Sequence, residues 1–235
     1  MKRLVFLVIL GVFLSACSGG ESVTRNIRVI AKAEVDGKVV EGSAVMGLRW
    51  KAGGQGRMYV RSRTEAVILE LGGRGTVYIL DGFYGSDDRV TKGYWPTLVQ
   101  ETLGILRTVR VTDFPLIEAA SGYYPVVPKR IGTPPTLPLM VTYTDETRME
   151  TMKRVKPKDF RRRFGSDVKF LGLWFEFTDD APTTKIPERL PIAVKVNESY
   201  YTAFPNRDSR GKLLPTRKKA FPYKVGKSAF MKRTF

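Results

Sequence analysis

The chain has 235 residues, of which 43% are hydrophobic and 27% charged, a composition typical of a globular protein. Its 40 Lys and Arg outnumber its 23 Asp and Glu, and the formal net charge of +17 favours association with anionic partners. A single cysteine excludes intramolecular disulfides and thiolate zinc clusters. The absence of histidine excludes Ser-His-Asp and Cys-His catalysis and His-ligated metals, so we expect no metal site and no cofactor.

The first residues have the layout of a secretory signal. A positively charged start is followed by an apolar run over 4–14 and by two small residues that precede Cys17. A membrane-spanning helix needs about 20 apolar residues, so this run is too short for a conventional anchor. The pattern therefore predicts a signal peptide over residues 1–16. Because two basic residues lie in it, its removal leaves a formal net charge of +15.

The sequence Leu14-Ser15-Ala16-Cys17 resembles the lipobox of bacterial lipoproteins, at the expected place after the apolar run. In that family the Cys thiol receives a diacylglycerol and the signal is cut immediately before it. The resemblance implies that lipid is attached at Cys17 and that the bond between Ala16 and Cys17 is cleaved. Two or three buried acyl chains anchor a protein stably, at ~0.8 kcal/mol per buried CH₂. The alternative is an ordinary cleaved signal beside an unrelated cysteine.

The same resemblance implies a location. A lipoprotein of this kind is anchored in a membrane of the cell envelope and faces the periplasm. In Gram-negative lipoproteins an Asp after the Cys favours retention in the inner membrane, so Ser18 at this position favours the outer membrane. We expect residues 17–24 to form a flexible tether, because Gly19 and Gly20 follow Ser18.

A single β-rich domain is expected over residues 25–196. Apolar and polar residues alternate from residue 25 to 50 around Asp36-Gly37, which predicts a strand, a two-residue turn and a returning strand. Apolar runs on either side of the glycine-rich loop 72–75 predict a second hairpin.

Later segments predict both strands and short helices. Pro96 is expected to begin a helix, and residues 158–164 are expected to form one or two helical turns. Strands are expected over 137–143 and 168–177, and the second is apolar on both faces, as in the core strand of a sandwich. The predicted fold class is mainly β, an antiparallel sheet or sandwich-like arrangement with one or two short helices, with α+β as the alternative.

Three segments of the body show a further resemblance. Residues 137–145, 155–165 and 168–191 resemble an uncharacterised family of small exported proteobacterial proteins. This resemblance implies a Gram-negative source and a single domain, and it carries no information about chemistry.

Basic residues gather in two segments, one in the body and one in the tail over 197–235, which we expect to be loosely structured. A basic surface tethered beside anionic headgroups gains ~1 kcal/mol for each Lys or Arg close to the membrane. The alternative is a solvated basic face without a partner. The residues predicted to bind an anionic surface are Lys153, Arg154, Lys156, Arg161, Arg162, Arg163, Arg217, Lys218 and Lys219.

These observations favour a lipid-anchored envelope protein with a non-enzymatic, structural or binding role. Its expected partners are the membrane itself and anionic lipid or lipopolysaccharide. No nucleic acid is expected, because an exported protein rarely meets one, and no catalytic residue is predicted. Two alternatives stay open. An envelope hydrolase would need two facing carboxylates in a pocket, and an accessory protein that docks a protein partner would show an uncovered edge strand or an exposed apolar patch.

Overall fold

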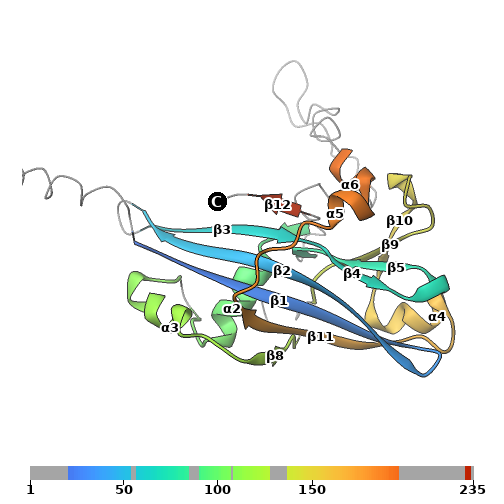
Figure 1. Cartoon of the computed structure of the whole chain (residues 1–235), viewed down its shortest axis with the longest axis horizontal. Helices are drawn as coiled ribbons and strands as arrows, with labels where there is room; N and C mark the ends of the chain where they lie inside the picture. The colour runs from blue at the N-terminus through green and yellow to red at the C-terminus, as the bar shows by residue number, and fades with distance from the viewer. Residues whose placement is uncertain are drawn as a thin grey trace, which may run out of the picture.

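The computed structural model describes residues 21–53, 57–84, 90–106, 108–127, 137–195 and 231–233. The predicted signal peptide, Cys17 and most of the basic tail lie outside these residues. The described part consists mainly of antiparallel sheets with a few short helices (Figure 1). The predicted fold class is therefore confirmed.

A long hairpin, β1 (Ser22–Val35) and β2 (Lys38–Ala52), forms the centre of the molecule. Asp36 and Gly37 both have positive φ, 50° and 73°, as a type I′ turn requires, which confirms the predicted turn. Alternate residues of β1 are buried, so one face of the hairpin is directed into the core. β1 begins three residues before the predicted start of the domain at residue 25.

The hairpin belongs to a six-stranded sheet with the order β12-β3-β2-β1-β11-β8, in which every pair is antiparallel. One face packs against the core, and the opposite face, here called the outer face, carries mostly exposed and half-buried side chains. The short strand β12 lies within the predicted basic tail and pairs with β3, so part of that tail is ordered. The other four strands are β3 (Met58–Glu65), β8 (Tyr123–Pro125), β11 (Lys169–Thr178) and β12 (Met231–Arg233).

A four-stranded sheet with the order β10-β9-β5-β4 packs against the core face of the hairpin. The chain enters it at Ala66, where β3 of the first sheet ends and β4 begins. β4 and β5 form the predicted glycine-rich hairpin around a short 3₁₀ helix, η2 (Gly72–Arg74). The strands of this sheet are β4 (Val67–Glu70), β5 (Thr76–Ile79), β9 (Met140–Tyr143) and β10 (Met152–Val155), and a separate pair is formed by β6 (Gly82–Tyr84) and β7 (Val90–Lys92).

Short helices complete the core. The longest helix in the described part of the chain, α2 (Tyr94–Thr102), begins two residues before the predicted Pro96. It buries Trp95 and Leu98 in the same core cluster as Trp50 of β2. The predicted helical turns over 158–164 are η5 (Pro157–Asp159) and α4 (Phe160–Phe164). The remaining helices and 3₁₀ helices are η3 (Val111–Asp113), α3 (Phe114–Glu118), η4 (Met149–Thr151), α5 (Ile186–Arg189) and α6 (Pro191–Lys195).

Residues 179–185, here called the strap, run from the end of β11 across β1 and β2 to α5 (Figure 1). The Asn26 side chain donates a hydrogen bond to the Asp180 carbonyl at 2.8 Å, and the Thr183 amide donates to the Val45 carbonyl at 3.0 Å. The strap therefore divides the outer face into a proximal half, which contains Ser22, and a distal half, which adjoins the turn at Asp36.

Candidate functional site

Four basic side chains gather on the proximal half of the outer face: Arg49 and Lys51 on β2, and Arg61 and Arg63 on β3. We call them the cationic strip. Arg49 lies directly opposite Arg61 in the register of the two strands, and directly opposite residues point to the same face with their Cβ atoms ~5 Å apart. Their neighbours along β2, Leu48 and Trp50, are fully buried, so the strip is directed away from the core.

The charge of the cationic strip is not neutralised by the described residues. No ion pair between described residues includes a member of the strip. The two like charges of Arg49 and Arg61, directly opposite each other, therefore destabilise the sheet. Arg49 donates to the Ser22 hydroxyl at 3.0 Å, while its buried Nε has no hydrogen-bond partner among the residues that the structure describes. By contrast, Arg28 on the same face pairs with both Glu176 and Asp180. The strip therefore provides positive charge suited to phosphate or carboxylate groups.

The cationic strip lies where the chain enters the domain. Ser22, the first residue of β1, is paired with Lys51. Four residues separate Ser22 from Cys17, and an extended chain advances at most ~3.6 Å per residue, which places the two Cα atoms within about 18 Å of each other. A lipid on Cys17 would thus hold the strip next to the membrane surface.

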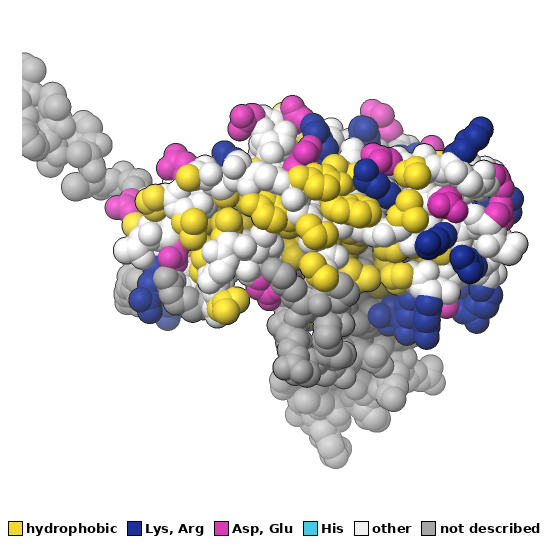
Figure 2. Space-filling model, turned by 90° about the horizontal axis from the view of Figure 1, so that it is seen from below, with side chains coloured by type: hydrophobic (Ala, Val, Ile, Leu, Met, Phe, Trp, Pro, Cys, Tyr) yellow, Lys and Arg dark blue, Asp and Glu magenta, His cyan; other side chains and the backbone are white. Residues whose placement is uncertain are grey.

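The basic residues that the sequence predicted in the body lie at the other end of the molecule. All six are exposed, in β10, at Lys156 and in α4, and Lys and Arg gather at this end in Figure 2. Arg74 links α4 to the β1–β2 turn: it pairs with Asp36 at 3.0 Å and Asp167 at 2.7 Å and donates to the Phe164 carbonyl. We call Lys153, Arg154, Lys156, Arg161, Arg162 and Arg163 the α4 cluster.

The length of β1 separates the α4 cluster from the cationic strip. The strand has 14 residues, and a rise of ~3.3 Å per residue puts its two ends roughly 43 Å apart. Within the α4 cluster, Arg162 is paired with Asp159 at 2.9 Å. The predicted Arg217, Lys218 and Lys219 lie outside the described residues, so the structure does not place them relative to either group.

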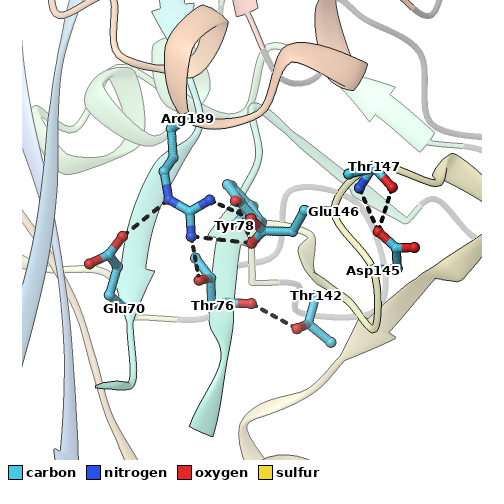
Figure 3. Close-up of polar contacts among 8 residues, drawn as sticks. All are labelled: Glu70, Thr76, Tyr78, Thr142, Asp145, Glu146, Thr147 and Arg189. Carbon is cyan, nitrogen blue, oxygen red and sulfur yellow. Dashed lines mark hydrogen bonds and ion pairs between the residues drawn. The ribbon is translucent and has the colours of Figure 1, made fainter. Parts of the chain in front are cut away.

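A second polar group joins α5 to the four-stranded sheet (Figure 3). The Arg189 guanidinium lies between two carboxylates, with Nε 3.1 Å from Glu70 and a bidentate pair to Glu146. It also donates to the Thr76 hydroxyl at 2.9 Å, while the Tyr78 hydroxyl donates to Glu146 at 2.8 Å. Burial, followed by the hydrogen bond to Glu146, raises the pKa of Tyr78 far above its usual range, so the phenol stays protonated.

This arrangement indicates a structural role for Arg189. A hydrolase that works through carboxylates needs room for a sugar or a water between them, and here the guanidinium fills that space. Other carboxylates in the described residues are also engaged. Asp145 accepts hydrogen bonds from Thr147, and Asp180 binds Arg28. Within the described ranges, no three acidic or thiol side chains come together to hold a metal ion.

We expect Arg189→Met to destabilise the protein by about 2 kcal/mol, because it leaves Glu70 and Glu146 close together without their shared cation. Urea unfolding followed by circular dichroism measures the change. Arg148→Met is the matched control. Among the described residues Arg148 pairs with Glu150 alone, and because both side chains are more than half exposed, the change should cost less than about 0.5 kcal/mol. Equal losses in the two variants would contradict the structural role.

Two further carboxylates meet at the distal turn. A hydrogen bond with Asp167 raises the pKa of Asp36 and lowers that of Asp167, and both carboxylates contact Arg74. The group ties the β1–β2 turn to the β4–β5 loop and to the loop before β11. It is open to solvent, and we assign it a role in holding these three loops together.

No protein-family model, curated protein or solved structure matches this chain. The two resemblances described from the sequence therefore remain predictions. In the part of the chain that the structure describes, no helix has the length and apolar character needed to cross a membrane.

Proposed function

We propose that this chain is a lipoprotein of the cell envelope, anchored through Cys17, whose cationic strip binds the anionic headgroups of the membrane that holds it. Its role is non-enzymatic, and it faces the periplasm, with the outer membrane favoured. The observation that carries the proposal is the position of the strip: unneutralised positive charge lies at the end of the sheet that the predicted tether enters.

The energetics support a contact of this kind. Each Lys or Arg close to an anionic surface contributes ~1 kcal/mol, and the contribution disappears beyond a Debye length of ~10 Å. A lipid on Cys17 would keep Ser22 within about 18 Å of the anchor, close enough for the strip to reach that region, whereas the α4 cluster lies roughly 43 Å further along β1. Tyr59, opposite Lys51 and 51% exposed, adds an aromatic ring with a polar tip, which suits the boundary between headgroups and water.

Charge reversal tests the proposal on the mature chain, residues 17–235, with its single thiol at Cys17 coupled to a single-chain lipid, which by itself gives only marginal, reversible membrane binding. We expect Arg61→Glu combined with Arg63→Glu to weaken binding to vesicles containing phosphatidylglycerol at least tenfold at low salt. The same two charge reversals at Arg161 and Arg163 in the α4 cluster are the matched control, and they should change the affinity less than threefold. Sedimentation of vesicles across a salt series measures both.

The strip variant also has an internal check on folding. Arg61→Glu places opposite charges across from each other at Arg49, so the free energy of unfolding should stay level or rise by up to about 1 kcal/mol. Weaker vesicle binding in a protein that is at least as stable cannot be attributed to unfolding. Equal losses in the strip variant and the α4 variant, or binding that salt does not weaken, would refute the proposed contact.

A further inference from the structure

Two aromatic rings lie side by side on the distal half of the outer face. Trp174 on β11 and Tyr123 on β8 have rings that are nearly parallel, at 15°, with centroids 6.5 Å apart. Tyr123 is 48% exposed and Trp174 is half-buried. Figure 2 shows hydrophobic side chains gathered on the face that carries β8 and β11. Among the described residues, the two nearly parallel rings provide an apolar surface that is partly open to solvent.

Gly172 keeps the indole flat against the sheet. It precedes Trp174 by two residues, on the same face, and a Cβ at this position would lie 3.0 Å from the indole ring. Its φ of 146° is also a conformation that side chains other than glycine rarely adopt. The absence of a side chain at Gly172 thus leaves room for the Trp174 ring to lie over the strand.

The polar groups around these rings are balanced in charge, unlike the cationic strip. The Lys32 ammonium lies over the face of the Trp174 ring, 5.5 Å from its centre, and pairs with Glu41 at 2.6 Å, so a ligand that stacks on the indole would share this face with the Lys32 side chain. Arg28 pairs with Glu176, which lies opposite Tyr123 in the register. Partly exposed donors and acceptors, paired with one another, thus surround the two rings. A pyranose ring has the complementary chemistry, with C–H groups that stack on an aromatic face and hydroxyls that bind charged side chains around it.

We propose that Trp174 and Tyr123 form a stacking platform for a glycan chain, and specifically for the amino-sugar polymer of the cell wall. The platform itself rests on the ring geometry and the balanced charges, whereas the choice of polymer rests on the proposed function. Ile30, which pairs with Trp174, is eight residues along β1 from Ser22, or roughly 26 Å. The platform therefore lies well away from the anchored end, on the part of the domain that extends into the periplasm.

Binding of a β-1,4-linked N-acetylglucosamine hexamer to the purified mature chain tests the platform. Of the three tryptophans, Trp50 and Trp95 are fully buried, so a change in tryptophan emission on binding reports Trp174. We expect saturable binding that shifts the emission, and at least a tenfold loss of affinity in Tyr123→Ala. Trp174→Phe should abolish the emission shift while calorimetry still detects binding. Tyr59→Ala, an equally exposed tyrosine on the proximal half, should bind like the parent.

Three outcomes would overturn the platform: no binding of the hexamer, equal losses in Tyr123→Ala and Tyr59→Ala, or an affinity for maltohexaose equal to that for the amino-sugar chain. Because Tyr123 lies on a short edge strand, Tyr123→Ala tests the platform without disturbing the core. The Arg61→Glu, Arg63→Glu variant separates this proposal from the membrane contact. It should bind the hexamer normally, so loss of vesicle binding with glycan binding retained would concern the strip alone.

Discussion

Replacing Gly42 with alanine is expected to destabilise the protein by more than about 3 kcal/mol, which is a large part of the stability of an ordinary domain. A Cβ at Gly42 would lie 1.9 Å from the Ile68 carbonyl oxygen and 2.9 Å from the Leu69 Cα. Both atoms belong to the backbone of β4, so no side-chain rotation can relieve the clash. The two sheets would have to separate where Leu69 is fully buried between them.

Urea unfolding followed by circular dichroism measures this effect, and Gly73→Ala is the control. Gly73 lies in the loop between β4 and β5, and a Cβ there meets no atom within 4 Å. Alanine should be neutral at Gly73, or stabilising by up to about 1 kcal/mol, because it restricts the unfolded chain. If the free energy of unfolding of Gly42→Ala lies within 1 kcal/mol of the parent's, the close approach of β2 and β4 is wrong.

Replacing Cys17 with serine is expected to abolish incorporation of labelled palmitate and to release the protein from the membrane fraction of the cell. The hydroxyl of serine cannot form the thioether that the lipobox resemblance implies. The effect should be complete, because this is the only thiol in the chain. Metabolic labelling of cells that express the full chain, followed by fractionation, measures both results.

Ser18→Asp is the companion variant for the anchor. It keeps Cys17 and should therefore retain the label, while the resemblance predicts that it moves the protein from the outer to the inner membrane fraction. Retained labelling in Cys17→Ser would rule out lipid attachment at this residue. The cationic strip would then have to be reconsidered, because its proximity to a membrane depends on that anchor.

The sequence predicts the parts of this fold that local patterns determine. The β1–β2 hairpin follows from alternating residues and an Asp-Gly pair that tolerates positive φ, and the β4–β5 hairpin follows from glycines between apolar runs. Several short strands escaped prediction, namely β6, β7, β8, β10 and β12, and two of them show the reason. β8 lies in a proline-rich stretch and β12 in a basic tail, and each is a strand only because a distant neighbour, β11 or β3, offers a free edge.

The residues of the candidate sites become neighbours through the register in which the strands pair. Looking for residues that are close together in the sequence therefore did not reveal these sites. Grouping neighbouring residues found the α4 cluster, whose members follow one another along the chain. Arg49 and Arg61 become neighbours only when β2 and β3 pair, and Tyr123 meets Trp174 only when β8 joins β11. One local signal was present: Arg61 and Arg63 flank Ser62 with the period of a strand, which puts both charges on one face.

The 14 residues of β1 set the distance between the two ends of the domain. Ser22 lies at one end of the strand, and the Arg74 pairs fasten the other end to the second sheet, so the hairpin is braced rather than free to bend. In an anchored protein, the height of the α4 cluster above the headgroups would then be set by the number of residues in a strand. The hairpin would then keep the cationic strip at the membrane and the α4 cluster roughly 43 Å away from it, in the periplasm.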